Sequence, residues 1–119
     1  MIARVWHGIT PAAVADKYLE HVQTVDLAGC RAVPGNRGAF VFRHISSGVA
    51  EFLIISVWDS YDAIRDYTGS DDINASVYHN EDLRCLTFPE PRVTHYTLLA
   101  ADVELLQAAL EKNPFEGTG

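Results

Sequence analysis

The stretch VAEFLIISVWDS, residues 49–60, decides the fold of this chain. Its residues 52–57 form a nearly continuous apolar run, which is typical of a strand whose side chains are covered on both faces. Such a strand belongs in the middle of a sheet. Trp58 closes it, and Asp59 and Ser60 carry side chains that cap the N-termini of helices. The stretch therefore predicts a central strand that leads directly into a helix.

The rest of the chain supplies further strands and helices around this centre. Thr10 and Pro11 are expected to start a helix as its cap and first residue. Ser46-Ser47-Gly48 predicts a tight hairpin into the central strand, and Gly69 should end the helix that follows it. The expected strands are 2–8, 38–45, 49–58 and 92–100, and the expected helices are 10–29, 60–68 and 102–113.

Several shorter features are also expected. Residues 30–33 are interpreted as a short extended piece, and Ser70 as the cap of one or two further helical turns. Residues 78–82 form a polar segment. Four residues are then expected to return to the core: Leu83, Cys85, Leu86 and Phe88.

The order strand–helix–strand–strand–helix–strand is that of the ferredoxin-like, split βαβ plan. It predicts an α+β domain with a four-stranded antiparallel sheet and helices on one face. Apolar residues such as Trp6 and Leu53 fall on both faces of that sheet, so a monomer would expose a large apolar patch. We therefore expect a homodimer in which two sheets meet as an α+β barrel, with the helix over 102–113 extending the contact.

The composition argues against some classes of binding partner and favours one cellular location. The chain has 119 residues and is expected to be one domain, with its core over 2–100. Its formal charge of −7 argues against nucleic acid and anionic membranes as partners. Without a long apolar run or a signal-peptide pattern, a cytoplasmic protein is expected. Cys30 and Cys85 are expected to be reduced core residues, and no grouping has metal-site spacing, so no metal is predicted.

Five stretches together resemble the antibiotic biosynthesis monooxygenase family, over residues 2 to about 100. They are MIARVWHG (1–8), GNRGAFVFR (35–43), EFLIISVWDSYDAIRDY (51–67), DD with VYHNED (71–82), and RVTHYTLL (92–99). The most specific element is the strand ending in Trp-Asp-Ser before a helix that opens with an aromatic residue and an alanine. The resemblance implies a small dimeric α+β-barrel protein with a pocket between sheet and helices in each subunit.

The resemblance also implies three functions. The first is cofactor-independent oxygenation of a small phenolic or polyketide-like substrate by dioxygen. The second is binding and breakdown of haem, and the third is binding of a small molecule without turnover, as in a stress protein.

Trp58 and His79 are the two expected catalytic residues. In the resemblance, a tryptophan at this strand end contacts the substrate or the haem plane. Here Trp58 would orient a ring and donate its indole N–H, while the alternative is a core aromatic. His79 could deprotonate a phenol or bind iron, and its alternative is a solvent-exposed loop histidine.

Five further residues are expected to bind substrate: His7, Arg43, Ser56, Tyr67 and Tyr78. Ser56 shares a strand face with Trp58, and His7 lies near the end of the first strand. Haem-degrading relatives place an asparagine on that strand and the iron-binding histidine on the second helix, and neither is matched here. Quinone-forming relatives use an asparagine just before the tryptophan, a tyrosine and an arginine. In this chain, similar chemistry is available from Tyr67, Tyr78 and Arg43, although their positions do not match the family's motif.

Overall fold

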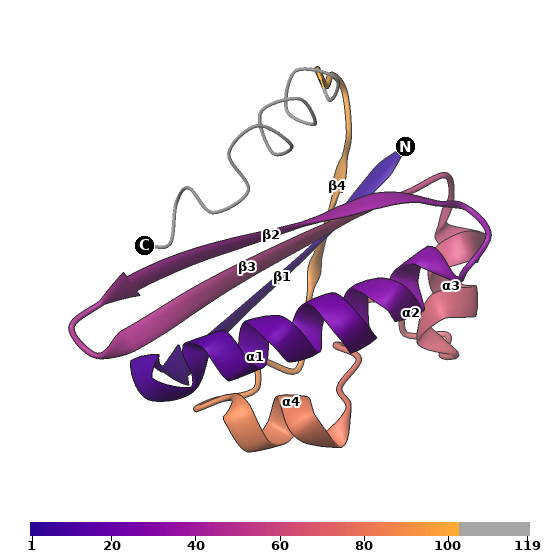
Figure 1. Ribbon diagram of the computed structural model, residues 1–119. Coiled ribbons are helices and arrows are strands. Elements are labelled where there is room, and N and C mark those ends of the chain that lie inside the picture. Colours follow the sequence, from indigo (N-terminus) through magenta and orange to yellow (C-terminus); the bar gives the residue numbers. More distant parts are fainter. Residues whose placement is uncertain (103–119) are drawn as a thin grey trace.

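In the computed structural model, which describes residues 1–102, four antiparallel strands form one sheet in the order β2-β3-β1-β4 (Figure 1). This order confirms the ferredoxin-like α+β fold and places β3 inside the sheet. The strands are β1 Ile2–Pro11, β2 Asn36–Ser46, β3 Val49–Trp58 and β4 Thr94–Thr97. The helices are η1 Ala12–Val14, α1 Ala15–His21, η2 Val22–Asp26, α2 Leu27–Arg31, α3 Tyr61–Thr68 and α4 Asn80–Cys85.

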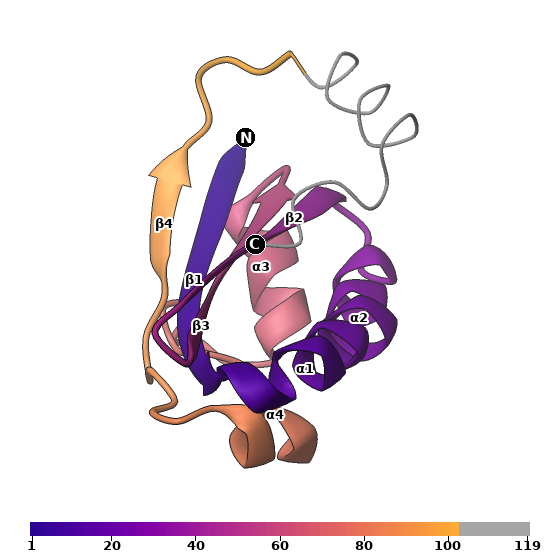
Figure 2. The same cartoon turned by 60° about the vertical axis from the view of Figure 1, so that its left-hand side comes forward.

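The helices α1, α2 and α3 lie on one side of the sheet (Figure 2). The side chains of Phe52, Ser56 and Trp58 alternate along β3 toward this side and are buried. Their neighbours on β3 face the other side, where the described helices do not cover them. The strand pairing puts these residues on that face, which we call the open face: Ala3, Val5, Phe40, Phe42, Leu53, Ile55, Val57 and Tyr96.

Local signals in the sequence explain the best-predicted elements. The Ser60 hydroxyl accepts a hydrogen bond of 3.2 Å from the Ala63 N–H and caps α3, as expected. Gly69 ends that helix with a φ of 66°. In the hairpin between β2 and β3, Ser47 and Gly48 have φ angles of 53° and 78°, as a two-residue turn with matching twist requires.

The first helix differs from its prediction at both ends. Thr10 does not cap it, because β1 continues to Pro11 and pairs Thr10 with Ala50. Residues 30–33 are not extended, since α2 continues to Arg31.

After α3 the chain also differs from expectation. Ser70 starts no helix. The segment 78–82 is not merely a polar loop, because it leads into α4 with His79 as its N-cap. Leu83 is 50% exposed rather than in the core, because α4 turns only Asp82 and Cys85 inward, and Phe88, which follows α4, is 73% exposed. The predicted last strand, 92–100, is shorter, and the helix expected over 102–113 lies outside the described residues. Within residues 1–102 no helix has the length and apolarity to cross a membrane.

Candidate active site and a neighbouring histidine–aspartate cluster

A cavity of about 50 Å³ lies between the sheet and the helices. Arg4 and Trp6 from β1, and Ile54 and Ser56 from β3, supply its sheet side. This volume has room for several water molecules or for dioxygen. The full lining is Arg4, Trp6, Tyr18, Asp26, Leu27, Cys30, Ile54, Ser56, Tyr67, Val77, Tyr78, Asp82 and Val93.

Among the described residues that line the cavity, Arg4 is the one strongly basic side chain, and it is only 5% exposed. Its guanidinium donates to the backbone carbonyls of Ile73 and Ala75, at 2.5 and 2.8 Å, and lies 3.2 Å from Nε2 of His95. Within residues 1–102 it forms no ion pair with a carboxylate. Burial lowers the pKa of Arg4, although the group stays charged near neutral pH. A buried cation without an anionic partner is rare in proteins.

Four aromatic side chains contribute to the remaining wall: Trp6, Tyr18, Tyr67 and Tyr78. The Trp6 indole N–H donates to the Tyr78 hydroxyl at 3.0 Å, and that hydroxyl donates to the Glu90 carbonyl. The Arg4 guanidinium carbon lies 5.9 Å from the centre of the Tyr67 ring. Burial, and then the neighbouring Cys30, raises the pKa of Tyr67, so this phenol stays protonated at neutral pH.

Gly8 makes room for Trp6. A Cβ atom at this position would overlap Cζ2 and Cη2 of the Trp6 ring and lie 3.0 Å from Leu86. We expect Gly8→Ala to lower the free energy of unfolding by about 1–3 kcal/mol, because overpacking forces the indole to move. The matched control is Gly29→Ala in α2, where a Cβ meets no atom within 4 Å and alanine should stabilise the helix by up to about 1 kcal/mol. Urea unfolding of both variants tests this, and equal effects would contradict it.

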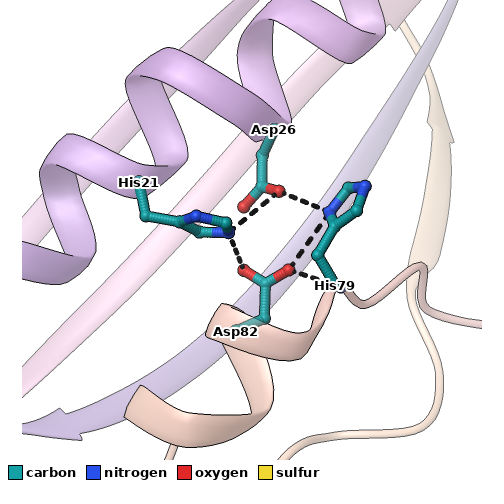
Figure 3. A group of neighbouring side chains, drawn as sticks. All are labelled: His21, Asp26, His79 and Asp82. Carbon is teal, nitrogen blue, oxygen red and sulfur yellow. Dashed lines mark hydrogen bonds and ion pairs between the residues drawn. The ribbon is translucent and has the colours of Figure 1, made fainter.

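Four side chains form a second group beside the cavity (Figure 3). We call it the His–Asp cluster: His21, Asp26, His79 and Asp82. Nε2 of His21 lies 3.5 Å from Oδ1 of Asp26 and 3.3 Å from Oδ1 of Asp82. Nδ1 of His79 lies 3.0 Å from Oδ1 of Asp26 and 3.4 Å from Oδ2 of Asp82. Because Asp26 and Asp82 also line the cavity, the cluster forms part of its wall.

A π-helical segment explains how Asp26 joins this cluster. In η2 the Leu27 N–H donates to the carbonyl of Val22, five residues back, instead of four. The extra residue changes which side chains face inward. Val25 continues the apolar spacing of Tyr18 and Val22 but is 39% exposed, while the Asp26 side chain is 17% exposed. A regular helix predicted from the apolar pattern would have missed this turn.

Asp82 holds the cluster in place from the start of α4. Its carboxylate accepts the His79 backbone N–H at 2.8 Å and the Tyr18 hydroxyl at 3.1 Å. Its side chain is 2% exposed. Burial, and then the neighbouring Asp82, raises the pKa of Asp26 to about 8. Two carboxylates this close cannot both ionise cheaply without a cation between them.

Only some of the residues expected at the site line the cavity. Ser56, Tyr67 and Tyr78 line the cavity. Trp58 does not, because it is fully buried beside it and packs on Tyr67, with ring centres 5.2 Å apart. Its indole N–H donates to the Ser56 hydroxyl at 2.9 Å, so this donor already has a partner.

The remaining expected residues lie elsewhere. His79 belongs to the His–Asp cluster, with its side chain 49% exposed. His7 projects from the open face of the sheet and contacts Glu51 and Glu90, which raise its pKa. Arg43 forms an ion pair of 2.8 Å with Asp16 of α1 and does not line the cavity.

In the sequence analysis no role was assigned to Arg4, the side chain that distinguishes this cavity. An arginine on an alternating strand is normally paired with an acid or solvated, and Arg4 is neither within the described residues. Trp6 was recognised only as an apolar strand residue. No metal was predicted because no grouping in the sequence has metal-site spacing. The structure brings residues 21–26 and 79–82 together in the His–Asp cluster, which no local spacing reveals.

Several solved structures share this fold. The chain shares its fold with Rv0793 from Mycobacterium tuberculosis, at 21% identity and a TM-score of 0.55 over 85% of this chain and 98% of that one. The haem-degrader MhuD from Mycobacterium tuberculosis, with two haems in its active site, gives 15% identity and a TM-score of 0.55 over 86% and 99%. A monooxygenase from the gene ActVA-Orf6 of Streptomyces coelicolor, in complex with nanaomycin D, gives 23% and 0.53 over 85% and 88%.

No curated protein matches the chain. The sequence profile described as antibiotic biosynthesis monooxygenase matches residues 8–77, which is more than half of the chain. The chain therefore belongs to the antibiotic biosynthesis monooxygenase family.

Proposed function

We propose that this protein is a monooxygenase that oxidises a small phenolic or polyketide-like aromatic compound with dioxygen. The observation that carries the proposal is Arg4, a buried guanidinium without a carboxylate partner in residues 1–102, lining a cavity with aromatic walls. Such a cation stabilises an anion that forms beside it in a water-poor site. A phenolate is the anion of this substrate class, and it is the form that gives electrons to dioxygen. Family membership supports the same reaction type.

The proposed reaction takes all its electrons from the substrate. Arg4 favours the phenolate, and the phenol proton leaves to water. The phenolate gives one electron to dioxygen, and the two radicals combine at a ring carbon to form a carbon-bound peroxide. Protonation of the peroxide, cleavage of its O–O bond and loss of the hydrogen on that carbon leave one oxygen as a carbonyl and release the other as water. One phenol and one dioxygen thus give one quinone and one water.

The cavity must widen before a ring can enter it. Its volume of about 50 Å³ is well below the roughly 150 Å³ of an engineered cavity that binds benzene. Residues 69–79, between α3 and α4, contribute Val77 and Tyr78 to the wall. Arg4 holds this segment through the carbonyls of Ile73 and Ala75. We therefore place substrate entry at this segment, with Tyr67 and Ser56 on the fixed part of the wall.

The lining of this cavity does not offer haem a histidine ligand, because none of the described residues that line it is a histidine. His7 lies on the opposite face of the sheet, and His79 faces Asp26 and Asp82. The proposed reaction accordingly has no step that involves haem.

Oxygen consumption tests the proposed function. The purified protein is given a panel of monocyclic and polycyclic phenols, and oxygen uptake is compared with quinone formation. We expect one dioxygen consumed per quinone, with one atom of labelled dioxygen found in the product. Saturable binding of a phenol without oxygen uptake would instead identify a non-catalytic binding protein.

We also propose that the protein is a homodimer joined through the open face. Phe42 and Tyr96 on this face are 51% and 57% exposed, and soluble monomers rarely leave such an apolar face uncovered. Light scattering at micromolar concentration should give twice the mass of the chain. Phe42→Glu should give the monomer mass, while Phe88→Glu, at a residue outside the sheet strands that is 73% exposed, should leave the dimer intact. A monomeric wild-type protein would contradict the proposal.

A further inference from the structure

We propose that His21, Asp26, His79 and Asp82 bind one divalent transition-metal ion of the Zn²⁺ class, which joins the first helix to α4. This site is separate from the proposed oxygenase chemistry and does not depend on it. Its ligands come from two parts of the chain: α1 with η2, and the start of α4 (Figure 3).

The distances match tetrahedral coordination. One ligand atom from each residue lies within 4.8 Å of the other three. Oδ1 of Asp26 lies 3.5 and 3.0 Å from the nitrogens of His21 and His79, and Asp82 presents Oδ1 to His21 at 3.3 Å and Oδ2 to His79 at 3.4 Å. Zinc bonds of about 2.0–2.2 Å arranged as a tetrahedron put neighbouring ligand atoms roughly 3.3–3.6 Å apart. The side chains therefore need only small movements to share one ion.

His21 gives the second, independent indication. Its side chain is 10% exposed, and its buried Nε2 makes no hydrogen bond within residues 1–102, although carboxylate oxygens of Asp82 and Asp26 lie 3.3 and 3.5 Å away. Figure 3 shows this nitrogen directed between the carboxylates of Asp26 and Asp82. Buried polar nitrogens are almost always hydrogen-bonded, so one without a partner requires an explanation. A metal ion accepts the lone pair of a neutral imidazole and supplies that partner.

The two carboxylates of the His–Asp cluster also favour a bound cation. The two carboxylates are 17% and 2% exposed, and neither forms an ion pair with lysine or arginine within residues 1–102. Buried carboxylates are normally paired with a cation or coordinate a metal. A divalent ion would balance both charges of Asp26 and Asp82 at once.

The ligand types select the class of metal. Imidazole suits zinc and its neighbours among the transition metals, whereas Mg²⁺ and Ca²⁺ prefer sites made of oxygen atoms. His79, with half of its side chain exposed, leaves a route for the ion to enter. A bound ion would link α1, η2 and α4 beside the cavity, because Asp26 and Asp82 line both sites.

Metal titration of the chelator-treated, full-length protein tests this proposal. Calorimetry with Zn²⁺ should give one site per chain, and Co²⁺ should give the intense visible bands of tetrahedral coordination. The melting temperature should rise with Zn²⁺ and not with the same concentration of Mg²⁺. His21→Gln and Asp26→Asn should each lower the affinity for Zn²⁺ by at least about 10- to 100-fold. This is the typical cost of losing a partner that only orients a metal ligand, and loss of a ligand itself should cost no less.

His44→Gln is the matched control, because His44 is an exposed histidine on β2 away from the cluster. It should bind Zn²⁺ as the wild type does. Unchanged affinity in His21→Gln, or an equal loss in His44→Gln, would show only adventitious binding to surface side chains and overturn the proposal. Asp82→Asn is not used alone, since Asp82 also caps α4 and could affect folding.

Discussion

Replacing Arg4 by glutamine is expected to lower kcat/KM for the phenolic substrate by about 100- to 1,000-fold. This is the typical cost of removing one donor that stabilises a developing oxyanion. Arg4 is buried, so no water replaces its charge beside the substrate oxygen. Steady-state oxygen uptake, with kcat and KM measured separately, checks the prediction. A variant with wild-type kcat/KM would remove Arg4 from the proposed reaction.

Two further variants separate this effect from loss of structure. Arg4 also holds the carbonyls of Ile73 and Ala75, so Arg4→Gln should be compared by circular dichroism and melting temperature before its activity is interpreted. Arg4→Lys keeps the positive charge but loses the planar guanidinium with its paired N–H donors, so it should retain part of the activity. Arg43→Gln, on β2 outside the cavity lining, should remain within about threefold of the wild type if only the cavity cation matters.

Replacing Trp58 by alanine is expected to lower the free energy of unfolding by about 3–5 kcal/mol, as for other buried aromatic residues. The side chain is fully buried and packs in a cluster with Cys30, Ala63 and Ile64. Its removal would leave a cavity and take the hydrogen-bond donor from Ser56. Urea unfolding followed by far-ultraviolet circular dichroism measures the change.

Two substitutions serve as controls for Trp58. Phe88→Ala removes an aromatic ring that is 73% exposed and should change the free energy of unfolding by no more than about 0.5 kcal/mol. Trp58→Phe keeps most of the packing and should retain wild-type oxygen uptake per folded molecule. Loss of activity in folded Trp58→Phe would return Trp58 to the catalytic role that the family resemblance suggested.

Much of the fold could be predicted from the sequence because local and global signals agree there. The apolar run of β3, the Ser47-Gly48 hairpin and the Ser60 cap each specify one local structure, and the sheet order follows from joining them. Where local signals conflicted with tertiary pairing, tertiary pairing prevailed. Thr10 has the chemistry of a helix cap, but it pairs with Ala50 inside the sheet.

The candidate site was less accessible to sequence reasoning, for two physical reasons. The first is that the role of Arg4 depends on the absence of a carboxylate beside it within residues 1–102. A sequence pattern does not show which side chains are absent from a site. The second is that η2 changes the side chains that face inward, so a helical period of 3.6 residues places Asp26 wrongly. Ser56 was found because it shares a strand face with Trp58, a pattern that β3 retains, whereas Tyr67 and Tyr78 were chosen by their chemistry alone.

The π-helical turn also makes this wall of the cavity sensitive to chain length. A turn closed over five residues instead of four is an α-helix that carries one additional residue. Deleting one residue from 22–26 would restore the α-helix and rotate everything after it by roughly 100°. Leu27 and Cys30 would then leave the core. A single-codon deletion in this turn would therefore change the acidic and the apolar residues of the wall together.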